Sequence, residues 1–380
     1  MRLKLFFLAF SSILLIACGA EDTTEPPAEL IDFESSAVIE ELWDVSTGSG
    51  VNQHYLKLYP LLLSDRIVLA DRNGTVKAVD LDDGDELWSV DLDVVISGGV
   101  GGNEKFHSVT SRDGDVFLLD AENGDIKWQE SVATEVLVPA EIVRDRLVMK
   151  TVDGKIIALD LATGKQQWVY KRDVPALSLR GGSRLIVVDD KILTGLDSGR
   201  LVALDVTGKS LFDAAVAIPR GKSELERIVD IDGDAVFKNN ILYIASYQGS
   251  VIAIDIRRGQ LIWKRKLSTY TGVEVDQSTL FSADERDYIW ALDRANGATL
   301  WKMEKLSARR ITRPVAMSDA IVVCDSEGYL HWISQYDGRF LARKDTGTSG
   351  CIVPPVVRGN QLYVLSRDGE LNVYQYIKNN

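Results

Sequence analysis

The feature that most constrains this 380-residue chain is a short segment that recurs along its length. One copy reads Gly-Lys-Ile-Ile-Ala-Leu-Asp from Gly154 to Asp160, and Gly164 and Trp168 follow it. The copies begin at positions 74, 114, 154, 199, 249, 287, 328 and 369. A period of about 40 residues with alternating apolar side chains predicts the blades of a β-propeller.

Each unit also carries signals for antiparallel strands. In the third unit, residues 146–150 and 155–159 are strand-like and flank the turn pair Asp153-Gly154, and a strand that ends at Trp168 closes the unit. Eight units predict an all-β protein: an eight-bladed β-propeller of four-stranded antiparallel blades over residues 38–380.

The eighth unit lacks its last strand, and a segment near the N-terminus can supply it. Residues 41–44, Glu-Leu-Trp-Asp, match the Trp-bearing strand of the other units. We therefore expect residues 39–46 to pair with the C-terminal blade beside residues 361–376 and close the ring. Closure removes two free sheet edges that would promote aggregation.

A tryptophan recurs at one place in most units. The six residues are Trp43, Trp88, Trp128, Trp168, Trp263 and Trp301. A large aromatic side chain at a fixed period favours a structural role, the docking of one blade on the next. These residues therefore need no cofactor to explain them, and none is expected.

The first residues predict an export signal. A positively charged start precedes an apolar run from Leu5 to Ile16, which as a helix spans about 18 Å, too short for a hydrocarbon core of about 30 Å. Residues 1–17 are therefore expected to be a lipoprotein signal peptide.

A lipid anchor follows from the residues around the cleavage point. Leu-Ile-Ala before Cys18 resembles the bacterial lipobox, so Cys18 is expected to be lipidated, and Gly19 in place of Asp implies the outer membrane. Residues 18–37 are acidic and contain Pro, which predicts a flexible tether on the periplasmic face of that membrane.

Composition limits the functional classes. A net charge of −13 lacks the electrostatic attraction that drives nucleic-acid binding, so no nucleic-acid partner is expected. Three His and three Cys residues provide few ligands for a metal cluster. Acidic residues at 80–84 and 230–234 are interpreted as turn chemistry rather than calcium loops, and no metal site is expected. A periplasmic disulfide between Cys324 and Cys351 is possible, and the sequence leaves it open.

Two units exceed the regular length, in the 45- and 50-residue intervals. The excess contains Leu177, Leu179 and Arg180 in one segment and Asp230 and Asp232 in the next. Both segments join the last strand of one blade to the first strand of the next, so we expect them side by side on one face. They form either a mixed patch for protein recognition, or core leucines of an inner strand with Arg180 paired to an aspartate. The sequence pattern alone does not distinguish between these two alternatives.

The repeat resembles the Trp-docking repeats (PQQ-like repeats) of quinoprotein dehydrogenases, which makes an enzyme the main alternative. Those enzymes are longer and use an adjacent Cys-Cys pair and a calcium–quinone site over the funnel. This chain has no adjacent Cys pair, and side-chain capping of a turn explains its repeated Asp residues.

Signal, lipobox, acidic tether and eight Trp-marked blades together resemble the BamB family, the lipoproteins of the bacterial outer-membrane β-barrel assembly machinery (BAM complex). Departures from the pattern are Phe212 and Ala342 in place of Trp, and a Gly-rich segment at 97–104. The resemblance implies that the residues that bind the central barrel insertase, BamA, are Leu177, Leu179, Arg180, Asp230 and Asp232.

The function that this resemblance implies is a non-enzymatic scaffold. Expected partners are the periplasmic (POTRA) region of a BamA-like insertase, the other BAM lipoproteins, nascent outer-membrane proteins and outer-membrane lipid through acylated Cys18. The alternatives are a periplasmic quinoprotein-like enzyme and a generic periplasmic propeller adaptor with another partner.

Overall fold

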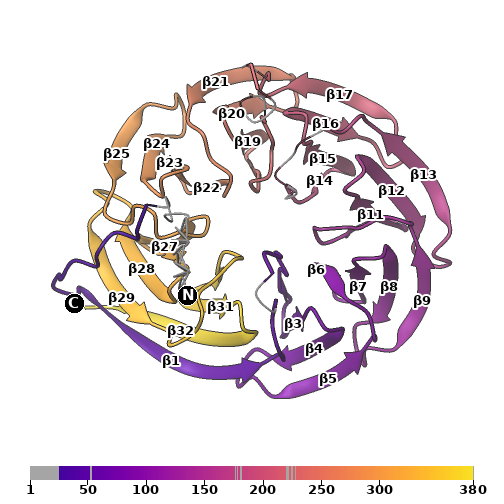
Figure 1. Cartoon of the computed structure of the whole chain (residues 1–380), viewed down its shortest axis with the longest axis horizontal. Coiled ribbons are helices and arrows are strands. Elements are labelled where there is room, and N and C mark those ends of the chain that lie inside the picture. The colour runs from indigo at the N-terminus through magenta and orange to yellow at the C-terminus, as the bar shows by residue number, and fades with distance from the viewer. Residues whose placement is uncertain are drawn as a thin grey trace, which may run out of the picture.

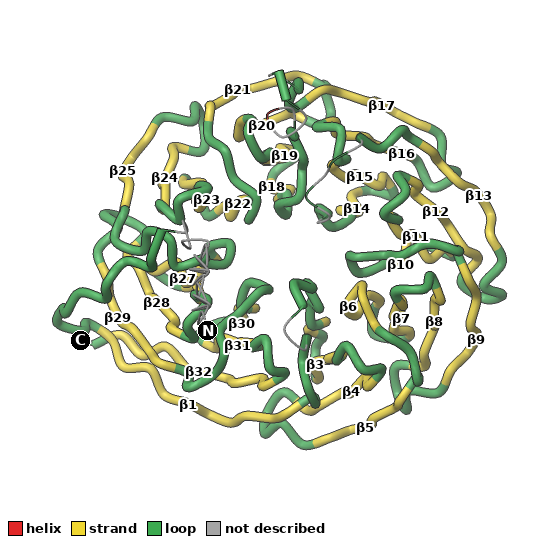
Figure 2. The backbone as a smooth tube through the Cα atoms, in the orientation of Figure 1, coloured by secondary structure: helices red, strands yellow, loops and turns green. Residues whose placement is uncertain are grey.

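Eight four-stranded antiparallel sheets stand around a common axis in the computed structural model (Figure 1). The structure describes residues 25–51, 54–175, 177, 179, 182–219, 222–223, 226 and 228–379. Each sheet is one blade, and its strands follow one another outward from the axis (Figure 2). The eight-bladed, all-β propeller predicted from the repeats is confirmed.

The blades are numbered along the chain, and the strands of each blade are named from the axis outward. Blade 1 has β2 (Leu61–Leu62), β3 (Arg66–Ala70), β4 (Thr75–Asp80) and β5 (Glu86–Asp91). Blade 2 has β6 (Ile96–Gly102), β7 (Phe106–Ser111), β8 (Asp115–Asp120) and β9 (Ile126–Ser131). Blade 3 has β10 (Glu141–Val143), β11 (Arg146–Lys150), β12 (Lys155–Asp160) and β13 (Gln166–Lys171). Blade 4 has β14 (Ile186–Val188), β15 (Lys191–Gly195), β16 (Arg200–Leu204) and β17 (Ser210–Ala215).

The remaining blades follow the same order. Blade 5 has β18 (Val236–Lys238), β19 (Ile241–Ala245), β20 (Ser250–Asp255) and β21 (Gln260–Lys266). Blade 6 has β22 (Val273–Val275), β23 (Thr279–Ala283), β24 (Ile289–Asp293) and β25 (Thr299–Met303). Blade 7 has β26 (Val315–Met317), β27 (Ala320–Cys324), β28 (Tyr329–Ser334) and β29 (Phe340–Asp345). Blade 8 has β30 (Val356–Arg358), β31 (Gln361–Leu365), β32 (Glu370–Lys378) and β1 (Ala37–Ser46).

The N-terminal strand β1 is the outermost strand of the C-terminal blade. It pairs antiparallel with β32, with Trp43 opposite Val373 and a register shift between Glu41 and Trp43. In Figure 1 this is the contact between the indigo and yellow ends of the described chain. The first and last strands of the propeller thus share one sheet.

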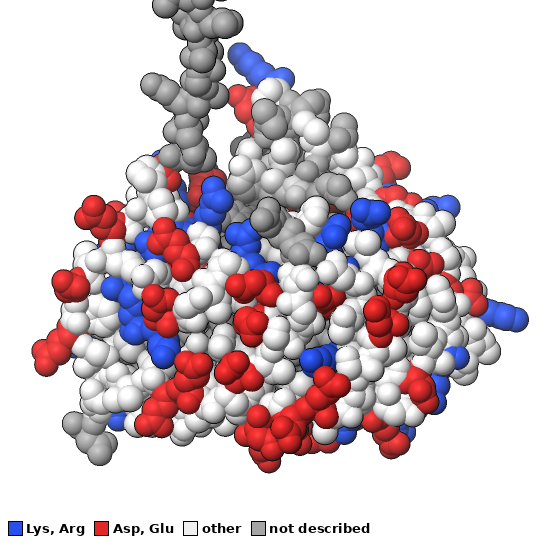
Figure 3. Space-filling view, turned by 60° about the horizontal axis from the view of Figure 1, so that its bottom comes forward, with Lys and Arg blue, Asp and Glu red and all other residues white. Residues whose placement is uncertain are grey.

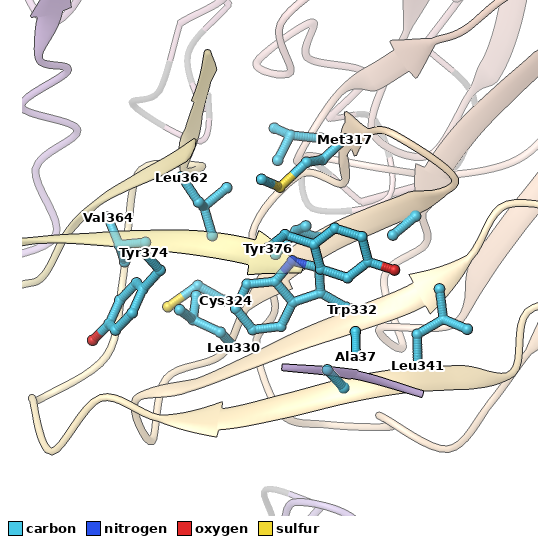
Figure 4. Packing of buried hydrophobic residues seen from close by; sticks show 14 of the residues in the cluster. Ala37, Met317, Cys324, Leu330, Trp332, Leu341, Leu362, Val364, Tyr374 and Tyr376 are labelled. Atoms are coloured by element: carbon cyan, nitrogen blue, oxygen red, sulfur yellow. The ribbon is translucent and has the colours of Figure 1, made fainter. Parts of the chain in front are cut away.

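The core lies between neighbouring blades. The second strand of a blade is buried on both faces because a sheet packs against each of them, and Ile67, Val68 and Leu69 of β3 are fully buried. Figure 4 shows the packing between blades 7 and 8, where Trp332 and Tyr376 stack with ring centroids 6.5 Å apart. Outer strands such as β9 are mostly exposed.

The recurring tryptophans lie at these blade junctions. The indole N–H groups of Trp88, Trp128, Trp168, Trp263 and Trp301 each donate to a backbone carbonyl in the turn of the next blade, at 2.8–3.0 Å. Each ring covers a turn glycine, and a Cβ on Gly124 would lie 2.6 Å from the Trp88 ring. At the Phe212 position the matching Gly259 has no neighbour within 4 Å of such a Cβ. The indole N–H of Trp43 is buried without a hydrogen-bond partner.

The repeated aspartates cap the same turns. The Asp120 carboxylate accepts the backbone N–H of Glu122 at 2.9 Å, and Asp80 accepts that of Asp82 at 2.7 Å. Asp160, Asp205, Asp255 and Asp293 make equivalent bonds. Turn capping as the explanation of these residues is therefore confirmed.

The Gly-rich segment at 97–104 falls mainly in β6, the inner strand of blade 2. A Cβ on Gly101 would lie 1.9 Å from the Ala140 carbonyl oxygen, and one on Gly99 would lie 2.7 Å from the backbone nitrogen of Tyr59. Only glycine allows the backbone to approach its neighbours this closely. The departure thus reflects crowding near the axis.

A disulfide joins Cys324 of β27 to Cys351, which lies in the connection from blade 7 to blade 8. The two Cα atoms are 5.9 Å apart. The bridge that the sequence left open therefore ties the last two blades together.

Residues 25–36 lie without regular secondary structure against blade 7 and the connection before it, and we call them the strap. Ala28 donates its N–H to Ser307 and accepts from the buried Arg309 side chain, both at 2.9 Å. Phe33 stacks on Phe340 with centroids 5.1 Å apart. This part of the tether expected at 18–37 is therefore not a free chain, a correction that follows from these long-range contacts.

Candidate functional site

All connections between successive blades emerge on one face of the ring, which we call the connection face. A blade has four antiparallel strands, so its outer strand ends on the side where its inner strand began. The connections that carry the predicted residues are residues 172–185, between β13 and β14, and residues 216–235, between β17 and β18, of which the second is the longest connection between blades. Because they flank blade 4, they lie on adjacent sides of one sheet.

The leucine pair of the first connection faces solvent. Leu177 is 45% exposed and Leu179 is 39% exposed, and both precede the inner strand β14. The alternative that they are core residues of an inner strand is therefore wrong. Leu179 also lines a cavity of about 360 Å³ together with residues of the connections into blades 1, 2 and 3. The segment therefore lies close to these connections on the connection face.

The second connection holds the first one in place. A carboxylate oxygen of Asp230, Oδ2, accepts the backbone N–H of Leu179 at 2.8 Å, and the Asp230 carbonyl accepts the N–H of Tyr247 at 2.8 Å. Asp230 therefore fixes the exposed leucine segment to blade 5. The structure does bring the two excess segments together.

The two aspartates are buried, in contrast to the expected surface position. Asp230 is 1% exposed and Asp232 is 4% exposed. Burial, followed by the nearby carboxylate of Asp232, raises the pKa of Asp230 to about 7, and burial raises the pKa of Asp232 to about 6. Arg180 lies outside the described residues, and so does Cys18.

Sequence reasoning missed an ion cluster beneath this segment. Asp234 is buried, with Arg184 Nε 3.4 Å from Oδ1 and Arg313 Nε 3.9 Å from Oδ2. Burial opposes ionisation, but the two arginines outweigh it and lower the pKa of Asp234. Arg184 also stacks over the ring of Tyr59 at 4.8 Å.

This cluster joins distant parts of the chain. Its members come from the connections that lead into blades 1, 4, 5 and 7. The only signal in the sequence was the third acid of the 230–234 run, whose partners no local spacing reveals. The cluster links the inner ends of these connections to one another.

In the described part of the chain we also searched for a metal-binding cluster and for a membrane-spanning helix. No group of three or more His, Cys, Asp or Glu side chains there is arranged to hold a metal ion. No helix in that part is long and apolar enough to cross a bilayer.

Known proteins match this chain along most of its length. A family model described as "Outer membrane protein assembly factor BamB" matches residues 72–303. The BamB protein of Pseudomonas aeruginosa is 38% identical over 365 residues, which cover 96% of each chain. The BamB protein of Escherichia coli K12 is 34% identical over 373 residues, which cover 94% of this chain and 95% of that protein.

Solved structures show the same fold. The crystal structure of BamB from Moraxella catarrhalis has a TM-score of 0.81 at 28% identity and covers 89% of this chain and all of that one. A quinohemoprotein alcohol dehydrogenase from Comamonas testosteroni has a TM-score of 0.69 at 13% identity, covering 89% and 76% of the two chains. The second likeness shows the propeller alone and not an enzymatic activity. The chain belongs to the BamB family of outer membrane protein assembly factors.

Proposed function

We propose that this chain is a non-enzymatic scaffold that binds the periplasmic region of a BamA-like barrel insertase through the segment around Leu177 and Leu179. The observation that carries the proposal is an exposed leucine pair tied down by a buried aspartate. A pre-organised segment loses little conformational entropy on binding, and exposed apolar side chains beside charges suit a protein partner.

Within this proposal the five expected binding residues divide into two roles. Leu177, Leu179 and Arg180 contact the partner. Asp230 and Asp232 position the segment that carries them, because they are buried and Asp230 bonds the Leu179 backbone.

The scaffold would be held at the periplasmic face of the outer membrane by acyl chains on Cys18, after removal of residues 1–17. Several acyl chains anchor a protein almost permanently. Anchoring would place it beside the other lipoproteins of the machinery and beside nascent barrel proteins, whose insertion it assists.

Co-purification from detergent-solubilised membranes tests the docking site. Wild-type protein should recover the insertase, and Leu177→Ser with Leu179→Ser should reduce recovery at least fivefold. Leu87→Ser is a matched control, because Leu87 is 44% exposed on the outer strand β5, away from the connection face. Equal recovery by the double variant and the control would contradict the assignment.

The positioning role has its own test. Asp230→Asn keeps an oxygen that can accept the Leu179 N–H and should retain most recovery, whereas Asp230→Ala should lose it. Arg180→Glu should reduce recovery by reversing a charge at the contact. If Asp230→Asn and Asp230→Ala behave alike, the hydrogen bond does not organise the site.

A further inference from the structure

A second feature of the connection face is a cavity of about 470 Å³ at the inner ends of blades 1, 6, 7 and 8. Its described lining includes four cationic residues, Lys57, Arg310, Arg313 and Arg367, and no Asp or Glu. The whole chain has a net charge of −13, and Figure 3 shows acidic side chains spread over the outer side of the ring. The wall of the cavity is therefore positively charged on a chain that is negatively charged as a whole.

Three of these cations form no salt bridge within the described part of the protein. Arg313 pairs with Glu274 and lies near Asp234, but Lys57, Arg310 and Arg367 form no ion pair with another described residue. Burial lowers the pKa of Lys57, but nearby tyrosines and the carboxylates of Asp234 and Asp232 outweigh it and raise that pKa above its ordinary value. Lys57 therefore carries its charge in the half-buried wall.

The backbone holds the cations in position. The Arg367 N–H donates to the Gly350 carbonyl at 2.8 Å, and the Arg367 carbonyl accepts from Val51 at 2.9 Å. The buried Asp287 carboxylate accepts the backbone N–H groups of Arg310 at 2.7 Å and Ile311 at 3.2 Å.

Arg310 is held in a conformation that its side chain disfavours. Its φ is +54°, in the left-handed region where glycine or asparagine fits more easily. An arginine at this position costs stability that a glycine would not.

We propose that this cavity is a binding site for a phosphorylated group, which is either a small soluble phosphate or the phosphate of a lipid headgroup. Guanidinium groups bind phosphate oxygens in pairs, and the ammonium of Lys57 adds a point charge. The tyrosine and threonine hydroxyls on the wall supply neutral donors. The volume lies within the range of small-molecule sites, about 300–1,000 Å³. A phosphate is favoured over a single carboxylate because it offsets more of the unpaired positive charge.

Titration calorimetry with sodium pyrophosphate tests the site. All eight sheets lie within residues 37–378, so a chain that begins at Glu25 contains the complete ring and the strap. Wild-type protein should bind one pyrophosphate, and Arg310→Gln and Arg367→Gln should each weaken binding about tenfold, as expected for loss of a charged hydrogen bond. Arg257→Gln is the matched control, because it removes one charge from an exposed turn of blade 5 and should change the affinity less than twofold.

The outcomes separate the possibilities. Lack of saturable binding by the wild type, or equal weakening in the control, would overturn the site, and thermal unfolding of each variant excludes misfolding as the cause. If Arg310→Gln does not fold, Lys57→Gln with Arg367→Gln takes its place. Tighter binding of a hexaglutamate peptide than of pyrophosphate would also overturn the proposal, in favour of an acidic polypeptide.

Two further probes distinguish the sources of phosphate. Arginine-dependent binding to phosphatidylcholine vesicles that contain phosphatidic acid, without binding of glycerol 3-phosphate, supports a lipid headgroup. Binding of glycerol 3-phosphate without binding to the vesicles supports a soluble phosphate. Neither result depends on docking to the insertase, so this test and the co-purification can fail separately.

Discussion

Trp88 and Gly124 form one of the residue contacts that recur around the ring. The indole is 7% exposed, lies over the glycine and donates to the Ala121 carbonyl at 3.0 Å. This contact combines apolar burial with a satisfied polar group, which is the arrangement that a large aromatic residue needs in a core.

Replacement of Trp88 by Ala should lower the free energy of unfolding by about 3–5 kcal/mol, because it leaves a cavity and removes the indole hydrogen bond to the Ala121 carbonyl, which still accepts from Arg66 at 2.8 Å. Phe212→Ala is the comparison, since that ring does not cover its glycine, Gly259. Phe212→Ala should lower the free energy of unfolding by clearly less than Trp88→Ala does. Denaturant unfolding of both variants measures the difference, and similar losses would show that docking on the turn glycine contributes little.

The buried aspartates give a second prediction at this scale, the pH dependence of stability. The pKa of Asp230 is raised to about 7 in the folded chain, above its ordinary value. The folded state therefore binds more protons than the unfolded state between about pH 4 and pH 7, and this carboxyl reduces stability as pH rises through that window.

Asp230→Asn removes this titration and keeps an acceptor for the Leu179 N–H. The melting temperature of the variant, relative to that of the wild type, should rise from pH 5 to pH 8. The reason is that the wild type loses roughly 2–4 kcal/mol of stability over this range through Asp230. Asp113→Asn, at a side chain that is 79% exposed, should leave the difference constant. Parallel pH profiles for the wild type and Asp230→Asn would rule out a buried, titrating carboxylate.

At the scale of elements, the sequence predicted the parts that repeat. The Asp-Gly turns, the Trp position and the unpaired segment around Trp43 specify the blades and their order, because each depends on spacing within a unit or on a match between units. The burial of Asp230 and the partners of Asp234 depend on contacts between blades. No local sequence pattern encodes those contacts. The sequence therefore could not show that Asp230, expected in a surface patch, is buried and positions the leucine segment.

The Cys324–Cys351 bridge illustrates the same limit, since the sequence shows two cysteines but not their separation in space. It closes a loop with a sequence separation of 27 residues. A loop of that length corresponds to about 3–4 kcal/mol of stabilisation. Protein refolded with reductant should therefore melt at a lower temperature than oxidised protein.

A double Cys324→Ala, Cys351→Ala variant is the control, and reductant should not change its melting temperature. A chain that begins at Glu25 contains only these two cysteines. Denatured without reduction, it should show no titratable thiol, and two thiols would exclude the bridge.

For the whole molecule, the strap determines where the chain leaves the ring. Arg309 and Arg343 bind the carbonyls of Ala28 and Ile31, and Arg309 is itself held by Asp325 at 2.7 Å. Acidity and Pro content alone predicted a free tether, because Arg309 and Arg343 lie 281 and 312 residues further along the chain than the carbonyls they bind.

Phe33→Ala with Arg343→Ala should release the strap. Limited proteolysis should then remove the first residues at least five times faster, while the propeller stays intact. Arg339→Ala, an exposed change on the same blade, provides the comparison. Unchanged cleavage in the double variant would mean that the strap is not held by these side chains.

Ala28 is bound beside the connection from blade 6 to blade 7, and Leu177 and Leu179 emerge between blades 3 and 4 on the same side of the disc. Three whole sheets therefore separate the point of attachment from the leucines. Because the contacts of Ala28 hold the strap at that junction, the separation between the strap and the exposed leucines is set by the width of the ring and not by the length of the strap.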